Sequence, residues 1–188
     1  MRVLVPLAEG FEEIETVTVV DVLRRADLDV TLAGLLPGPC LGSRGIVVTG
    51  DASLEDLDPL DFDALVLPGG MGGTLAMAEH AGLLEALRAF RDQNRWVAAI
   101  CAATLVLDRA GVAEGVPVTA HPSVHDQLGA NLEPGPRVLQ SGRMITSQGP
   151  GTAMEFALEL VRAWVGDAKR AELAQAMVVA PPVHGAPR

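Results

Sequence analysis

Short apolar runs alternate along the chain with longer amphipathic segments. Each apolar run predicts a strand, and the runs lie at residues 3–7, 30–34, 46–49, 64–67, 96–100, 116–120, 138–140 and 144–147. The run at 96–100 is the most continuously apolar, as expected of a central strand that is buried on both faces. This alternation predicts an α/β fold with a mostly parallel sheet and helices on both of its faces.

Apolar residues that recur every three or four positions predict the helices. These segments lie at 13–26, 82–93, 102–110, 152–165 and 167–177. In the first segment the apolar face comprises Ile14, Val17, Val20, Leu23 and Ala26. Glycine and proline between 35 and 45 predict a loop, and the proline-rich tail after 180 is expected to fray.

The composition narrows the class of protein. With 188 residues, of which 49% are hydrophobic and 20% charged, the chain is long enough for one packed domain over 1–188. A formal net charge of −10 without a basic run disfavours nucleic acid and anionic membrane surfaces as partners. Two cysteines do not make a disulfide framework, so we expect free thiols and a cytoplasmic location.

One of these cysteines lies where a catalytic group is expected. Cys101 follows the strand at 96–100 and precedes the helix at 102–110. Ligands gather beyond the carboxyl ends of the strands in a parallel sheet. A thiol at a helix N-terminus also lies at the positive end of the helix dipole, which favours the thiolate. Cys101 is therefore the candidate nucleophile.

Two other loops reach the same edge of the predicted sheet. The loop after the first strand leads to Glu15, and another strand is followed by Gly69 and Gly70. A carboxyl beside a thiolate is expected to keep its proton, so Glu15 is the candidate acid or base. The backbone N–H groups of Gly69, Gly70 and Ala102 are candidates for cradling an oxyanion.

The residues alone leave plainer alternatives open. Cysteine is among the most buried residue types, so Cys101 also fits a small core position. Glu15 lies in an acidic first turn and also fits a solvated helix face. The glycine pair after the strand also fits an ordinary turn.

Four motifs occur in order along the chain: LAEGFEEIETV at 7–17, VLPGG at 66–70, AAICAA at 98–103 and TSQGPGT at 146–152. Together they resemble the DJ-1/PfpI superfamily, in particular its deglycase branch and its bacterial YajL-like branch. The resemblance extends over nearly the whole chain. It implies a flavodoxin-like three-layer sandwich, a homodimer and chemistry that needs no cofactor.

The resemblance also implies roles for single residues. Cys101 matches an oxidation-prone nucleophile, and Glu15 matches its hydrogen-bonding partner. His121 matches a histidine that the deglycase branch places near the cysteine, and a structural histidine before a proline is the alternative. Arg44 matches an arginine at the mouth of the pocket, and a solvated surface arginine is the alternative.

No metal site is expected. His121 and His125 are four residues apart, but Pro122 disfavours a helix through His121 that would bring the two rings to one face.

The function that the resemblance implies is a cysteine-dependent enzyme of carbonyl stress, of the glyoxalase or protein-deglycase type. It would act through a hemithioacetal on methylglyoxal or on early glycation adducts of amines and thiols. One alternative is an oxidative-stress sensor or chaperone in which Cys101 is oxidised to a sulfinate. A further alternative is a cysteine hydrolase or peptidase, which needs a histidine beside the cysteine, and His121 is its weak candidate.

Overall fold

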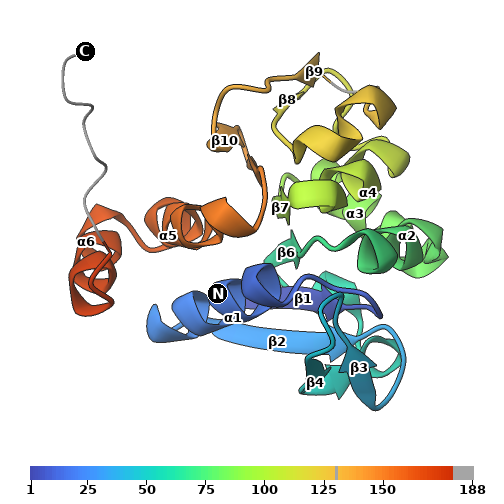
Figure 1. The fold of residues 1–188 in the computed structure, drawn as a ribbon, viewed down its shortest axis with the longest axis horizontal. Helices are drawn as coiled ribbons and strands as arrows, with labels where there is room; N and C mark the ends of the chain where they lie inside the picture. Colours follow the sequence, from blue (N-terminus) through green and yellow to red (C-terminus); the bar gives the residue numbers. More distant parts are fainter. Residues whose placement is uncertain (130, 180–188) are drawn as a thin grey trace.

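The fold is built around one seven-stranded sheet (Figure 1). The computed structural model describes residues 1–129 and 131–179, so the tail for which the sequence predicts fraying lies outside the described residues. The strand order is β10-β11-β7-β6-β1-β2-β5. All neighbouring strands are parallel except β10 and β11, which are antiparallel. The predicted mostly parallel sheet is confirmed.

The strands of this sheet are β1 (Arg2–Leu7), β2 (Asp29–Gly34), β5 (Ala52–Ser53), β6 (Ala64–Leu67), β7 (Trp96–Ile100), β10 (Val138–Ser141) and β11 (Met144–Ser147). Two short pairs lie outside it, namely β3 (Pro39–Leu41) with β4 (Val47–Thr49), and β8 (Pro117–Val118) with β9 (Asn131–Leu132). Short 3₁₀ turns connect several elements: η1 (Leu54–Asp56), η2 (Pro59–Asp61), η3 (Cys101–Ala103), η4 (Pro122–Gln127) and η5 (Pro150–Thr152).

Helices cover both faces of the sheet, as predicted (Figure 1). One layer contains α1 (Glu13–Arg25), α5 (Ala153–Trp164) and α6 (Asp167–Ala176), in which α5 packs against both of the others. The opposite layer contains α2 (Met71–Glu79), α3 (Ala81–Asp92) and α4 (Thr104–Arg109).

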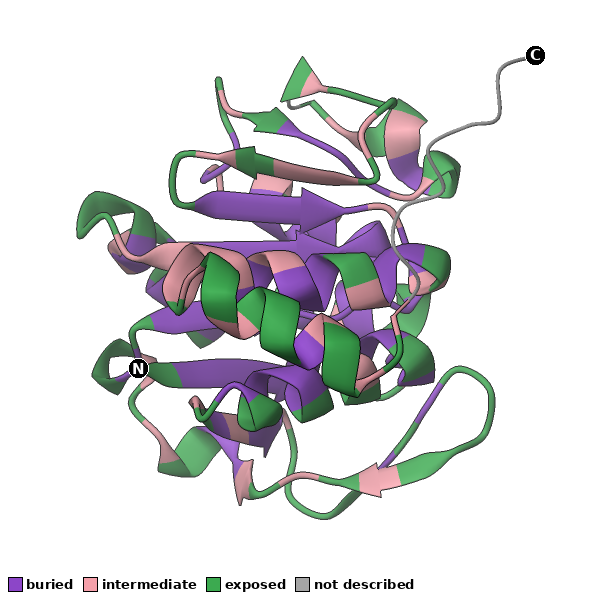
Figure 2. Cartoon of the chain, turned by 90° about the vertical axis from the view of Figure 1, so that its left-hand side faces the viewer, coloured by how far each residue is buried: buried purple, intermediate pink, exposed green. Residues whose placement is uncertain are grey.

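Alternate residues of each strand pack into two separate cores. In β1, Val3 and Val5 belong to the core beneath α1 and α5, whereas Leu4 belongs to the core beneath α3 and α4. All three are fully buried, and Figure 2 shows the same burial along the central strands. Burial of a side chain of this size contributes roughly 1.5–3 kcal/mol. Because both faces are packed, the carboxyl ends of the strands are fixed supports for the loops beyond them.

Three segments differ from the sequence prediction. The segment 35–45, predicted as a loop, contains β3, which pairs with β4 as a hairpin. Helix α2 was not predicted, because Gly72 and Gly73 in its first turn have poor helix propensity. The helix predicted at 102–110 is divided into the short turn η3 and the six-residue helix α4.

The predicted buried face of α1 is wrong for two of its residues. Ile14 and Val17 are 56% and 51% exposed. The helix is rotated so that Glu13, Glu15 and Thr16 face inward instead. Carboxylates do not face inward without polar partners, and both glutamates have partners in neighbouring loops.

Among the described residues, no helix is both long and apolar enough to cross a membrane.

Candidate active site

The candidate residues meet at the carboxyl edge of the sheet. Strand β1 lies between β2 and β6. The chain leaves β1 toward β2 on one side and leaves β6 toward β7 on the other, so the two connections diverge at this edge. Such a divergence point is where ligands bind in open α/β sheets. The loop after β1 leads to Glu15, and the loop after β6 carries Gly69. Strand β7, the other neighbour of β6, delivers Cys101.

Cys101 lies on a strained turn between β7 and η3. Its φ angle is +65°, a left-handed conformation that residues with a side chain seldom adopt. Strain of this kind costs on the order of 1–3 kcal/mol and persists only where the surroundings enforce it. Ile100 before it is in an extended conformation, so the chain turns sharply at the cysteine. The thiol residue is 9% exposed and lines a cavity, which gives a ligand access to it.

Glu15 approaches the thiol from the first turn of α1 and is fully buried. Its Oε2 accepts a hydrogen bond of 2.8 Å from the N–H of Gly69. Its Oε1 is buried and has no hydrogen-bond partner of good geometry among the described residues. Burial raises the pKa of Glu15 to about 7, and the charge of Glu12 adds to this, while the Cys101 thiol and the Gly69 N–H oppose it.

Gly69 has a different role from the one that the sequence suggests. Its N–H group donates to Glu15, so it is already used and does not face an oxyanion. A Cβ atom at Gly69 would lie 2.5 Å from Oε2 of Glu15 and 2.6 Å from Cβ of Cys101. The glycine therefore permits the carboxyl and the cysteine to approach each other. The N–H groups of Gly70 and Ala102 favour the charged form of the Cys101 thiol and so act to lower its pKa.

The thiol does not have the low pKa that the sequence suggests. Burial raises the pKa of Cys101 to about 12, and the charge on Glu15 adds to it, while the N–H groups of Ala102 and Gly70 oppose the shift. The helix dipole expected to favour the thiolate is weak, because only η3 and the six residues of α4 follow the cysteine. The carboxyl and the thiol therefore titrate as one pair, and the carboxyl loses its proton first.

His121 lies at the same cavity but is not hydrogen-bonded to the thiol in the described structure. Its backbone N–H donates to the carbonyl of Cys101 at 3.3 Å. Its ring Nδ1 accepts from the N–H of Ser123 at 3.2 Å and lies 2.8 Å from the Ser123 hydroxyl. The N–H contact is the one that a neutral ring with its proton on Nε2 makes, whereas the Ser123 hydroxyl can donate to Nδ1 or accept from it.

Arg44 lines the cavity, and Glu13 holds its backbone. The Glu13 carboxylate accepts from the backbone N–H of Arg44 at 2.6 Å and from the hydroxyl of Ser43 at 3.1 Å. Burial would raise the pKa of Glu13, but these bonds outweigh it and lower the pKa. Gly42 lies against this carboxyl, where a side chain would collide with it. Glu13 therefore fastens the β3–β4 turn to α1.

The cavity has a volume of about 470 Å³. Five of the predicted residues line it, namely Arg44, Gly70, Cys101, Ala102 and His121, whereas Glu15 and Gly69 lie behind the thiol and are not among the lining residues. Glu12, Ser43 and Ser123 also line it and were not predicted. Glu12 was detectable, because it precedes the first helix and its carboxylate caps the N–H of Glu15 at 2.8 Å. Ser43 and Ser123 reach the cavity only through tertiary packing.

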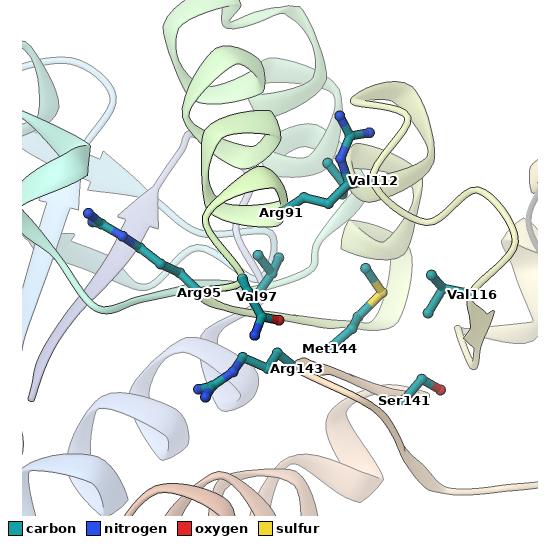
Figure 3. A pocket seen from close by; sticks show the side chains of 9 residues that line it. Arg91, Arg95, Val97, Val112, Val116, Ser141, Arg143 and Met144 are labelled. Atoms are coloured by element: carbon teal, nitrogen blue, oxygen red, sulfur yellow. The ribbon is translucent and has the colours of Figure 1, made fainter.

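A second cavity lies at the opposite edge of the sheet, where β7 and β11 begin (Figure 3). It is lined by Arg91, Arg95 and Arg143 and by apolar side chains. Figure 3 shows that the guanidinium groups of Arg91 and Arg95 point away from each other. Each donates instead to backbone carbonyls of neighbouring loops. The charges do not converge, so this cavity is a weaker candidate site.

Within residues 1–129 and 131–179, no three histidine, cysteine or acidic side chains are grouped closely enough to hold a metal ion.

Known proteins resemble this chain in sequence and in fold. Residues 1–163 match the DJ-1/PfpI family. The chain is 43% identical over 180 residues to protein dj-1beta of Drosophila melanogaster, a match that covers 94% of this chain and 96% of that protein. It is 37% identical over 175 residues to a Caenorhabditis elegans protein named glutathione-independent glyoxalase DJR-1.2, with 92% of each chain covered. The crystal structure of Drosophila DJ-1beta has a TM-score of 0.92 at 42% identity, with 96% of this chain and 98% of that one covered.

The buried carboxyl predicts a distinctive pH dependence of stability. The pKa of Glu15 rises from 4.5 in the unfolded chain to about 7 in the fold, so the fold favours the neutral carboxyl. Its contribution to stability is full below pH 4.5 and is lost as the pH rises through 7. Relative to Glu15→Gln, the wild-type free energy of unfolding should fall by about 3 kcal/mol over this interval. Urea denaturation at a series of pH values measures it, and parallel curves for the two proteins would contradict the assignment.

Proposed function

The chain belongs to the DJ-1/PfpI family, as its motifs predict, and from this premise we propose that it is a cofactor-free enzyme that converts reactive carbonyls into 2-hydroxy acids. Its substrates are 2-oxoaldehydes such as methylglyoxal, or early glycation adducts. The observation that carries the proposal is the buried Glu15 carboxyl, whose pKa of about 7 suits it to take and return protons beside the Cys101 thiol. The name of the glyoxalase relative supports the same chemistry.

In the first step the sulfur of Cys101 forms a bond to the aldehyde carbon. The Glu15 carboxylate takes the thiol proton as the sulfur attacks, which removes the obstacle of the raised thiol pKa. The N–H groups of Gly70 and Ala102 stabilise the charge that develops on sulfur. The π pair of the carbonyl moves onto oxygen, and Glu15 returns the proton to that oxygen. The product is a hemithioacetal, and Glu15 is again a carboxylate.

In the second step Glu15 removes the hydrogen on the former aldehyde carbon. The electron pair forms a double bond to the neighbouring carbon, which gives an enediolate. Glu15 then returns its proton to the neighbouring carbon, while the hydroxyl proton passes from the first oxygen to the second. The aldehyde carbon is thereby oxidised to a thioester and its neighbour is reduced to an alcohol, so no external oxidant or reductant is consumed. Water breaks the carbon–sulfur bond, releases the 2-hydroxy acid and restores the thiol.

His121 is a hydrogen-bond donor in this scheme. Because Ser123 occupies Nδ1, the proton on Nε2 is available to an oxygen of the bound substrate. The enediolate oxygen is the group that gains negative charge, so a donor there stabilises the intermediate. The same contact argues against the cysteine-hydrolase alternative, because that mechanism needs a histidine base hydrogen-bonded to the thiol.

Substitution of the two central residues should remove activity. We expect Cys101→Ser to abolish formation of lactate from methylglyoxal, and Glu15→Gln to lower kcat by roughly 10²–10⁴ because it removes the acid–base group. In the wild type, kcat/KM should rise with pH through about 7 as Glu15 ionises, and then level off. Lactate assays at a series of pH values measure both effects.

Cys40→Ser is the matched control, because Cys40 is also a buried free thiol but lines a different cavity. It should keep wild-type turnover. Full turnover by Cys101→Ser would overturn the mechanism. Selective oxidation of Cys101 to a sulfinate by mild peroxide, seen by mass spectrometry together with no carbonyl turnover, would favour the sensor alternative.

The protonation of His121 gives an independent prediction. ¹⁵N NMR should show an unprotonated Nδ1 and a protonated Nε2, and His121→Ala should lower kcat by about 10²-fold, as removal of an oxyanion donor does. His125→Ala is the control, because its ring Nε2–H donates to the backbone carbonyl of Ala120 and the residue lines no part of the cavity. A proton on Nδ1 of His121 would contradict the donor role.

We also propose that two copies associate through an apolar surface formed by Ile14, Val17, Ile46 and Val47, each between 51% and 58% exposed. The first two residues lie on α1, and the other two lie on or beside β4. Hydrogen bonds from the backbone of Arg44 and Ile46 to Glu13 hold these two elements together. Adjacent exposed apolar residues mark an interaction surface, and a two-fold dimer lets the same surface cover itself.

Val17→Glu should therefore convert a dimer into a monomer, because it places a charge at the centre of this surface. Light scattering coupled to size-exclusion chromatography measures the mass. Leu75→Glu is the control, since Leu75 is 54% exposed on α2 and lies outside the surface. A wild-type monomer, or a Val17→Glu dimer, would refute this interface.

A further inference from the structure

We infer that Gly149 leaves open the space in which the reacting aldehyde carbon is held, so that this glycine is a positioning residue of the site. The inference rests on the proposed function, which gives no role to the motif at 146–152. A methyl group at Gly149 would lie 3.1 Å from Cδ2 of His121. The same methyl group would lie 3.9 Å from the sulfur of Cys101 and 3.9 Å from Oε1 of Glu15.

These distances place one point in contact with all three reacting groups. Oε1 of Glu15 is the buried oxygen without a hydrogen-bond partner of good geometry among the described residues. A buried polar atom of this kind costs free energy unless a partner arrives. The space beside Gly149 therefore adjoins both the nucleophilic sulfur and an oxygen that is ready to receive a proton.

The proposed chemistry needs an atom at this position. The aldehyde carbon must bond to sulfur and then present its hydrogen to Glu15, so it must lie between the two. Reacting atoms begin at roughly 3–3.5 Å from each other. A methyl group in ordinary contact with both the sulfur and Oε1 would occupy that place.

The backbone at Gly149 cannot easily retreat from the gap. Its N–H is 3.0 Å from the hydroxyl of Thr152, and that hydroxyl donates to the Gly149 carbonyl at 2.8 Å. Thr152 is itself 4% exposed. The φ angle of Gly149 is 162°, an extended conformation that any residue adopts. An alanine there is therefore compatible with the backbone and fills the gap.

Gly149→Ala is the test, with Gly151→Ala as the matched control. A Cβ atom at Gly151 meets nothing within 4 Å, although it lies two residues away in the same turn. We expect Gly149→Ala to lower kcat/KM for methylglyoxal by about 100-fold, the loss that a displacement of about 1 Å produces. Gly151→Ala should keep wild-type turnover.

A second readout does not depend on the proposed function. The rate at which iodoacetamide alkylates Cys101, followed by mass spectrometry, should fall in Gly149→Ala by a similar factor, because its carbon must enter the same gap. If the wild type does not turn over methylglyoxal, the proposed function fails while alkylation still tests the gap. If Gly149→Ala keeps wild-type turnover and wild-type alkylation, the gap is refuted while the proposed function stands.

A double variant distinguishes two explanations for an effect of Gly149→Ala, namely that the added methyl group fills the gap or that it displaces the His121 ring. In His121→Ala, the close contact of 3.1 Å no longer exists, so an added alanine at position 149 disturbs no ring. Gly149→Ala should still reduce alkylation in this background by about the same factor. If the double variant is alkylated as fast as His121→Ala alone, then Gly149 serves only to avoid a collision with the His121 ring. That result would overturn the inference. Thermal denaturation confirms that each variant is folded.

Discussion

The site depends on one contact, the one between the carboxyl of Glu15 and the thiol of Cys101. Both groups are buried, and the N–H of Gly69 fixes one carboxyl oxygen, Oε2, while the other, Oε1, is buried without a hydrogen-bond partner among the described residues. Neither group ionises easily while the other is charged, so the pair retains a proton at a pH where a solvated carboxyl would have lost it. The sheet, the glycine at position 69 and the strained turn at Cys101 all keep these two groups together.

Much of the fold was predictable from the sequence because the central strands are buried on both faces. β6, β7 and β11 occur at the predicted residues. β6 and β7 are continuous apolar runs, as expected of strands that are buried on both faces. Helix α2 was missed because its formation depends on tertiary contacts. Gly72 and Gly73 oppose a helix locally, yet they permit close approach of the backbone at Gly10 and Phe11.

The site was predictable in its position but not in its ionisation. The ends of β1, β6 and β7 gave the places of Glu15, Gly69 and Cys101, because parallel strands end at a common edge. Burial was not visible in the sequence, and it is burial that raises the pKa of the thiol where a helix terminus predicts the reverse. The hydrogen bond from Ser123 to the His121 ring was also hidden, since it arises from the turn η4.

The Glu13 carboxylate holds two parts of the β3–β4 turn in place. Its buried carboxylate accepts hydrogen bonds from the backbone N–H of Arg44, which lines the cavity, and from that of Ile46, which belongs to the exposed apolar surface. The turn therefore connects the exposed apolar surface to the wall of the cavity that contains the thiol. A molecule that displaced this turn would have to break hydrogen bonds to one buried carboxylate, so the wall of the cavity and the exposed apolar residues depend on the same charged group.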